Sequence, residues 1–465
     1  MKKNYSFLLL LLIVHFFVFS QGSGNSLSFD GNTQIVTVPS LSTNIGNSDF
    51  TIECFAKFSS FADYGGLITA FDSNNGGWAI HQELDGSVTF LVGINASGAG
   101  SDVIGSLALA TGEWYHIVAV KNGTSLELFV NGESQGTVAS NRVINYYQVF
   151  IGSRYLNNPF PGQLWRHNGE LDEIRIWNSA LTQAEIRDWM TKKVTSSHPK
   201  YANLVAYYNF DSGSGATLVD QTSNGNNGTL VNTPTWQTSS APIGDDSSYL
   251  TSVDNTSSLN LVHSDGSDLT VNVTTGTAES LYIYNVEEEP NITTPPIGLV
   301  QLSQGNYFGV KAFGSSSLMY EVVYNYDGHS GISDENNLRL CYRTDNSTPN
   351  WTESSASLDI GLNTLTLGSQ TGTEFILGSV GGNTLPVDEF ELRDYTFFPN
   401  PTSDFLKLTE DDFMDSHYQI FDVRGRILLE GDIKFENKID VRNLSEGLYF
   451  LKFENSESYK FIKNK

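Results

Sequence analysis

Short runs that alternate between apolar and polar residues dominate the chain, and the three-to-four-residue spacing of an amphipathic helix is rare. One such run, residues 50–58, places five side chains on one face of a strand: Phe50, Ile52, Cys54, Ala56 and Phe58. Residues 114–120 and 126–130 flank Asn122-Gly123, a pair that is typical of a tight hairpin turn. Similar runs recur to the end of the chain. The pattern predicts an all-β protein built from several sandwiches.

The clearest junction between a strand and a helix lies in residues 169–190. The strand would place two pairs of apolar side chains on opposite faces: Ile174 and Ile176 on one, Leu171 and Trp177 on the other. Thr182 and Glu185 have the spacing of a capping box, in which each side chain accepts a hydrogen bond from the other residue's backbone N–H. We therefore expect a short helix to begin directly after Thr182.

The order of motifs along residues 25–242 resembles the laminin-G-like, concanavalin A-type jelly roll. The motifs are FDG, FTIE, EWYHIVAVKNGTSLELFVNG and GELDEIRIWNSALTQAEI, in this order. Residues 204–230 resemble the return strand and polar loop that often lie beside such domains. The resemblance implies a jelly-roll sandwich over residues 25–242.

The acidic residues of the GELDEIRIW motif invite comparison with laminarinase-like glycoside hydrolases, which share the jelly roll. Those enzymes carry two catalytic carboxylates four residues apart on one strand, because one must donate a proton while the other attacks or activates water. In this chain the residue four positions after Glu170 is Ile174, so the acid pair is broken. We therefore predict that the protein is not an enzyme, and keep a polysaccharide-active hydrolase or its carbohydrate-binding accessory as the alternative.

The resemblance also implies a structural calcium ion between the first strand and the closing strand. Asp30 and Asp172 stand at the matching positions. Asp72 begins a second oxygen-rich loop, and calcium prefers six to eight such hard oxygen ligands. The alternatives are an Asx-turn at Asp30 and at Asp72, and a contact of Asp172 with Arg175 or the backbone.

Aromatic residues crowd the sequence just before the closing strand, and four of them are candidate ligand contacts: Tyr146, Tyr147, Tyr155 and Trp165. Flat aromatic faces pack against the apolar faces of sugar rings, while nearby Asn and Asp can bind hydroxyl groups. The alternative is that these rings fill the core of the jelly roll.

Residues 395–465 resemble the type A C-terminal sorting domain of the type IX secretion system. The residues that carry the resemblance are Pro399, Asn400, Pro401, Asp422, Gly425, Gly447 and Tyr449. The resemblance implies a small Ig-like sandwich, a Bacteroidetes-like cell and export across its outer membrane. Residues 381–394 are interpreted as a linker. Residues 243–380 are interpreted as a second β-sandwich-like domain without a family signature.

The remaining features of the sequence concern its compartment and its partners. Residues 1–20 combine Lys2 and Lys3 with an apolar run, as expected for a secretory signal peptide, and no later run is long enough to span a membrane. The formal net charge of −26 argues against nucleic acid as a partner. Cys54 and Cys341 lie too far apart to indicate a disulfide framework.

Together these features predict a secreted or outer-surface recognition or adhesion protein that passes through the periplasm. Its partners would be a glycan or surface-protein ligand and the type IX secretion machinery, and Ca²⁺ would stabilise its jelly roll. A purely structural component of the surface layer is a further alternative, because fold resemblance alone does not fix function.

Overall fold

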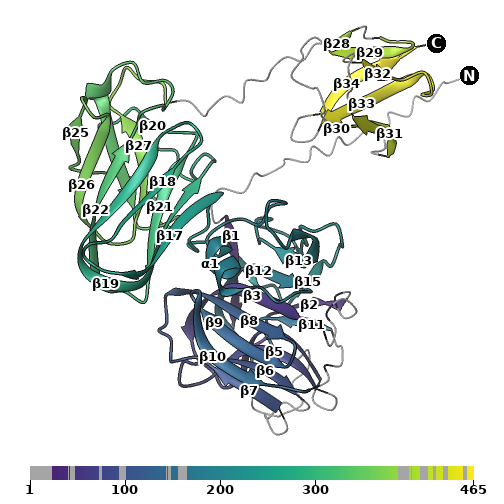
Figure 1. Cartoon of the computed structure of the whole chain (residues 1–465), viewed down its shortest axis with the longest axis vertical. Coiled ribbons are helices and arrows are strands. Elements are labelled where there is room, and N and C mark those ends of the chain that lie inside the picture. Colours follow the sequence, from purple (N-terminus) through teal and green to yellow (C-terminus); the bar gives the residue numbers. More distant parts are fainter. Residues whose placement is uncertain are drawn as a thin grey trace, which may run out of the picture. The chain divides into compact units, whose positions relative to one another are not determined.

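The computed structural model in Figure 1 shows an almost wholly β-stranded chain that divides into two compact units, Met1–Val387 and Asp388–Lys465. The residues that the structure describes are 24–39, 41, 45, 48–72, 76–93, 101–142, 144, 148–154, 165–385, 397–398, 401–408, 417–422, 426–432, 438–453 and 458–464. The predicted signal peptide, residues 1–20, and most of the predicted linker lie outside them. The predicted fold class, an all-β chain with a jelly-roll sandwich, is confirmed.

One sheet of the jelly roll, called sheet A, contains the closing strand near its centre. Its strands, in spatial order, are β10 (Glu133–Ala139), β9 (Ser125–Val130), β8 (Trp114–Asn122), β3 (Phe50–Ser60), β12 (Asn168–Trp177), β1 (Asn25–Asp30) and β16 (Thr235–Thr238), with β13 (Leu204–Tyr208) also paired to β12. The five side chains expected on one face of β3 all lie in the core. The alternating apolar residues of β3 therefore form the face of the strand that points into the core.

The opposing sheet, called sheet B, completes the jelly roll. Its strands, in spatial order, are β14 (Thr217–Leu218), β15 (Gly228–Val231), β2 (Ile35–Val38), β11 (Val149–Ile151), β4 (Gly65–Asp72), β5 (Gly76–Gln82), β6 (Val88–Gly93) and β7 (Ser101–Gly105). Large apolar side chains from both sheets, including Phe50 of sheet A and Trp78 of sheet B, form one core cluster between them. The free thiol of Cys54 is buried in the same cluster.

A single α-helix among the described residues, α1 (Gln183–Trp189), packs against the outer face of sheet A. It begins after Thr182, and both hydrogen bonds of the predicted capping box to Glu185 are present. Trp177, Val118 and Ile186 pack together beneath it. A 3-10 turn, η2 (Tyr201–Asn203), then leads into β13. This part of the outer face of sheet A is thus covered by the chain itself.

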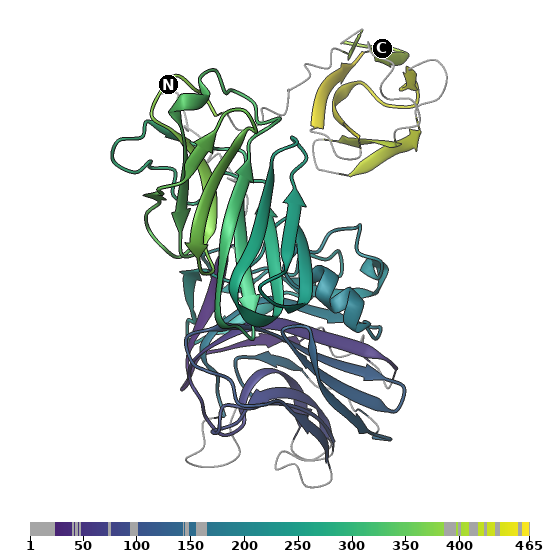
Figure 2. The same ribbon diagram turned by 60° about the vertical axis from the view of Figure 1, so that its left-hand side comes forward.

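Residues 246–379 form a second β structure, the middle domain, whose long strands run side by side in Figure 2. The spatial order is β24 (Thr352–Glu353), β23 (Leu338–Arg343), β27 (Glu374–Ser379), β21 (Tyr307–Phe313), β19 (Asp268–Val286), β22 (Ser316–Asn325), β26 (Thr364–Gln370) and β25 (Ser357–Asp359). Shorter partners are β17 (Asp246–Val253) and β18 (Ser258–Val262) beside β19, and β20 (Gln301–Leu302) beside β27. A 3-10 turn, η3 (Glu335–Asn337), precedes β23.

The 19-residue strand β19 joins the two halves of the middle domain. Its first part pairs with β18 and β22, and its second part pairs with β17 and β21. Register shifts near Thr275 mark the change of partner, and one core cluster contains residues from both halves, such as Val271 and Ile283.

The second unit, Asp388–Lys465, consists of two small sheets. One contains β28 (Phe397–Phe398), β29 (Phe405–Leu408) and β32 (Lys438–Asp440), and the other contains β31 (Ile427–Asp432), β30 (His417–Asp422), β33 (Gly447–Phe453) and β34 (Ser458–Lys463). Leu406 and Ile439 from the first sheet share a core cluster with Ile420 and Leu451 from the second. The two sheets therefore pack on each other.

Candidate functional site

A β-bulge in the closing strand β12 decides where its acidic residues point. Asp172 is paired with Phe55 of β3, but Arg175 is paired with Glu53, so β12 contains one residue more than its partner here. Glu173, inside the bulge, has a φ of 49°. The extra residue brings Leu171 onto the core face together with Ile174 and Ile176, while Trp177 lies on the outer face. The prediction that Leu171 shares a face with Trp177 was therefore wrong.

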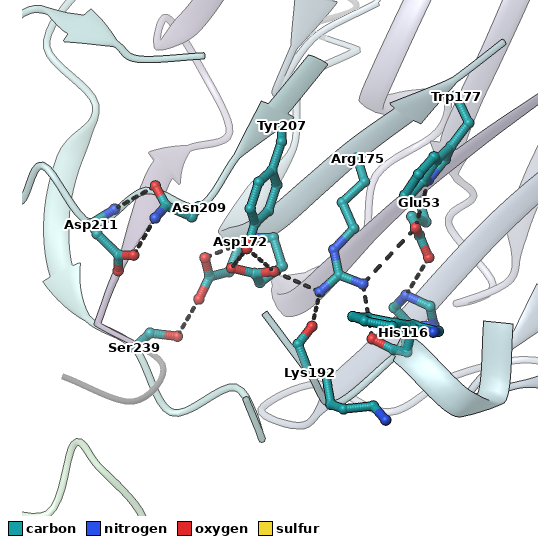
Figure 3. A network of polar contacts seen from close by, with 12 residues as sticks. Glu53, His116, Asp172, Arg175, Trp177, Lys192, Tyr207, Asn209, Asp211 and Ser239 are labelled. Atoms are coloured by element: carbon teal, nitrogen blue, oxygen red, sulfur yellow. Dashed lines mark hydrogen bonds and ion pairs between the residues drawn. The ribbon is translucent and has the colours of Figure 1, made fainter. Parts of the chain in front are cut away.

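The bulge directs a cluster of charged side chains onto the outer face of sheet A, where they are buried (Figure 3). Arg175 lies between two acids: its Nη2 atom is 2.6 Å from Oε2 of Glu173, and its Nη1 atom is 3.9 Å from Oε1 of Glu53. The guanidinium also donates to the backbone oxygens of Trp189 and Lys192. It thereby ties β12 to the segment after α1.

The neighbours of this cluster hold its charges in place. Burial raises the pKa of the Glu53 carboxyl, but His116 and Arg175 outweigh burial and the pKa lies below its ordinary value. Nε2 of His116 is 3.1 Å from Glu53, and the Trp177 indole donates to the same carboxylate. On the other side the Tyr207 hydroxyl donates to Glu173. Glu53 and Glu173 thus each accept a hydrogen bond from a neighbouring side chain.

Asp172 differs from Glu53 because the net effect of its surroundings opposes its charge. It is fully buried, and burial followed by the charge of Glu173 raises the pKa of its carboxyl well above the usual range, with Asp211 adding to the effect. Its Oδ2 atom accepts a 2.6 Å hydrogen bond from the Ser239 hydroxyl, and its Oδ1 atom accepts from the backbone N–H of Glu173. Figure 3 shows Asp211 and Asn209 beyond Ser239, bonded to each other.

Glu170, the first acid of the motif, is partly buried and already has partners. One of its carboxylate oxygens accepts a 2.7 Å hydrogen bond from the Ser26 hydroxyl, and the other lies 3.5 Å from the Lys57 ammonium. Ile174, the residue that stands where a second acid would be needed, points into the core. The acids of the closing strand are therefore engaged in structural contacts and do not face one another across an open cleft.

The structure does not bring the two expected calcium ligands together. Asp30 is paired with Asn168, four positions before Asp172, which separates the two by about 13 Å along the strands. The Asp30 carboxylate instead accepts hydrogen bonds from the backbone N–H groups of Asn32, Thr33 and Gln34. These bonds lower its pKa even though burial opposes them. Asp30 thus closes an Asx-type loop, and its oxygens do not fit a shared ion with Asp172.

The other candidate site residues of the jelly roll are placed as follows. Asp72 is the last residue of β4, and the loop after it lies outside the described residues. Tyr146, Tyr147 and Tyr155 also lie outside them. Among the residues that the structure does describe, no group of three or more His, Cys, Asp or Glu side chains is arranged to hold a metal ion.

Trp165 is only 4 % exposed and packs on Ala79 and Leu91 of sheet B. The Tyr64 ring stands edge-on to it at 5.2 Å, and the Arg154 guanidinium lies 5.3 Å from the centre of its ring. Both aromatic residues have positive φ values, which bulky side chains rarely adopt. Because its ring is covered, Trp165 does not offer an open stacking face in this conformation.

Some residues of the sorting motif are among the described residues of the C-terminal unit. Tyr449 is buried, stacks on Phe461 and donates its hydroxyl to the backbone oxygen of Ser445. Gly447 begins β33, and Pro401 is exposed before β29. Pro399, Asn400, Gly425 and the side chain of Asp422 lie outside the described residues.

Comparison with known families agrees with both resemblances. Residues 30–187 match the family model of the concanavalin A-like lectin/glucanases superfamily, and residues 396–464 match that of the secretion system C-terminal sorting domain. The chain carries a concanavalin A-like domain and a C-terminal sorting domain. The sorting domain directs the protein through the type IX secretion system to the medium or the outer cell surface. No helix among the described residues is long and apolar enough to cross a membrane.

Several solved structures resemble the chain in fold. A protein of Bacteroides ovatus described as a candidate carbohydrate binding protein is 20 % identical with a TM-score of 0.37, and the match covers 49 % of this chain and 62 % of that one. A heptameric SAP-like pentraxin from Limulus polyphemus is 19 % identical with a TM-score of 0.29, covering 36 % and 81 %. The CBM40 of a Ruminococcus gnavus sialidase, bound to α2,3 sialyllactose, is 12 % identical with a TM-score of 0.29, covering 36 % and 97 %. No curated protein matches the chain.

Export by the sorting domain has a direct genetic test. Deleting residues 395–465 should leave the protein in the periplasm, because the secretion system no longer has a sorting domain to recognise. Cell fractionation, with a periplasmic marker protein as the control for leakage, measures the outcome. Surface display that is unchanged by the deletion would contradict this assignment.

Proposed function

We propose that this protein recognises carbohydrate outside the cell and binds it without cleaving it. The name of the concanavalin A-like superfamily covers both lectins and glucanases, and the contacts of the closing strand support binding without cleavage. A glycosidase needs two carboxyl groups that flank the scissile bond. Here Glu170 is held by Ser26 and Lys57, and the other acids of the strand are buried. This sequestration of the acids is the observation that carries the proposal.

The proposal is tested by glycan-array binding of the chain without residues 1–20, together with an assay for reducing-sugar release from a polysaccharide panel. We expect binding to a defined set of glycans and no release. The Glu170→Gln variant should behave like the wild type in the release assay. Release that this substitution abolishes would favour the glycoside hydrolase, and the absence of any glycan binding would favour a protein ligand or a purely structural role.

We also propose that calcium binds at Asp172, with Asp211 in place of the expected Asp30. The support is chemical: the carboxylates of Asp172 and Asp211, the Asn209 amide oxygen and the Ser239 hydroxyl are hard oxygen donors of the kind that calcium prefers. Burial, Glu173 and Asp211 all oppose the negative charge of Asp172. A bound cation would supply the missing positive charge.

Thermal unfolding with and without a chelator tests this site. Saturating calcium should stabilise the wild type, by about 2.7 kcal/mol at a hundredfold excess over the dissociation constant. The Asp211→Asn variant should lose this response. Asp30→Asn is the matched control and should keep it, since Asp30 closes its own loop. A wild-type melting temperature that does not change on chelation would remove the calcium proposal and leave glycan recognition untouched.

A further inference from the structure

A cleft of about 770 Å³ lies between the concanavalin A-like domain and the middle domain, within the first compact unit. Its walls come from β8 and the loop before it on one side and from β21 and the turn before β27 on the other. Tyr115, Gln135, Lys311 and Thr371 are among the residues that line it. This volume falls in the range of ~300–1,000 Å³ that is usual for ligand sites.

Two residues of the cleft lining, Trp114 and Phe313, belong to a buried apolar cluster that spans the two domains. Trp114 and Phe55 of the concanavalin A-like domain share one core cluster with Tyr282 and Phe313 of the middle domain. The Trp114 indole also donates a 2.9 Å hydrogen bond to the hydroxyl of Ser240, in the segment that joins the domains. Because buried contacts of this kind resist rearrangement, the cleft is preformed.

Polar contacts also link the two domains. The Lys193 ammonium lies 3.0 Å from Asp245 and 3.1 Å from Glu288. The Asn346 amide donates to the backbone oxygen of Ser239, whose side chain is bonded to Asp172. The two domains are thus joined by polar contacts as well as by the apolar cluster.

The charges that line the cleft are largely paired. Lys57 lies 3.5 Å from Glu170, and Lys311 of the middle domain lies 3.4 Å from Glu113 of the concanavalin A-like domain. Two further acids, Glu279 and Asp345, complete the charged lining. Among the described residues that line the cleft, positive charge does not exceed negative charge, so the lining would not attract an anionic ligand. The chain as a whole carries a net charge of −26.

The rest of the lining combines hydroxyl and amide groups with apolar surface. Gln135, Thr344 and Thr371 supply donors and acceptors, while Leu109 and the half-buried ring of Tyr115 supply apolar area. A neutral sugar chain has the matching chemistry, because each hydroxyl both donates and accepts while the ring faces are apolar. We propose that this cleft binds a neutral oligosaccharide segment of a polysaccharide. The proposal rests on the carbohydrate recognition proposed above.

The test is an occluding substitution in the wall of the cleft. Thr371 is exposed and lines the cleft, so Thr371→Trp should fill part of it, and Ser315→Trp provides a second, independent occlusion. Thr275→Trp is the matched control, because Thr275 is also exposed but lies outside the lining. Binding of laminarin, arabinoxylan, galactomannan and anionic polygalacturonate to the chain without residues 1–20 is measured by titration calorimetry.

We expect a neutral polysaccharide to bind the wild type and the Thr275→Trp variant alike, and both occluding variants at least about tenfold more weakly. Hydrogen exchange of the wild type, with and without that polysaccharide, should show protection at residues 107–115 and 310–315. Unchanged affinity in both occluding variants, or protection confined to other strands, would overturn the cleft while leaving carbohydrate recognition intact. Binding of polygalacturonate alone would overturn the neutral ligand, and binding of no glycan at all would remove the proposed function itself.

Discussion

Replacing Arg175 by alanine should lower the free energy of unfolding by about 3–5 kcal/mol. Arg175 is 1 % exposed and lies between Glu53 and Glu173, so its removal leaves two buried carboxylates without their cation. It would also remove the guanidinium bonds to the backbone oxygens of Trp189 and Lys192, which loosens the segment after α1. Urea unfolding of the chain without residues 1–20 measures the loss.

The matched control for this prediction is Arg339→Ala. Arg339 also forms an ion pair, 3.2 Å from Glu353, but both side chains are more than one-third exposed. Water screens such a pair, and its loss should cost less than about 1 kcal/mol. Equal losses in the two variants would show that the Arg175 cluster does not behave as a buried charge network.

Acidification from pH 7 to pH 5 should destabilise the chain through its buried neutral histidines. Burial lowers the pKa of His167 to about 4, with a hydrogen bond to the Glu170 backbone oxygen acting in the opposite direction. Burial likewise lowers the pKa of His81 to about 4, partly offset by Glu83. In the unfolded chain each histidine titrates near 6.5 and binds its proton first. Protonation therefore favours unfolding, and stability falls between about pH 6.5 and pH 4.

Each of these histidines should contribute about 2 kcal/mol to the loss at pH 5. The His167→Gln variant should accordingly lose about 2 kcal/mol less than the wild type between pH 7 and pH 5, although it can be less stable than the wild type at pH 7. Denaturant unfolding at both pH values gives this difference. A pH dependence that is identical in the two proteins would show that His167 is not held neutral.

Local sequence signals predicted the parts of the fold that depend on neighbouring residues. The alternation in β3 placed its core face correctly, and the capping box at Thr182 located the start of α1. The bulge in β12 was not predictable in this way, because it arises from pairing with β3 and moves Leu171 to the other face. A period-two analysis assumes an unbroken register, which a bulge violates.

The candidate site likewise combines features that local sequence predicts with features that depend on distant residues. Asp172 stood out in the sequence, but its partner Ser239 lies 67 positions further on, and no spacing rule connects the two. The Arg175 cluster does have a signal in the sequence. Glu53, His116 and Arg175 are charged or polar residues within strands that otherwise alternate, and they lie on the outer faces of three adjacent strands. Their complementary charges could have indicated a buried network.

The central claim is that the protein binds carbohydrate without cleaving it. The most direct test is to titrate the chain without residues 1–20 with a polysaccharide that binds it in the glycan-array experiment. Titration calorimetry distinguishes the two activities because binding heat ends at saturation, whereas turnover releases heat for as long as substrate remains. We expect heat that saturates at a fixed stoichiometry and then stops. Continued heat after saturation, accompanied by shortened saccharide products, would contradict the account.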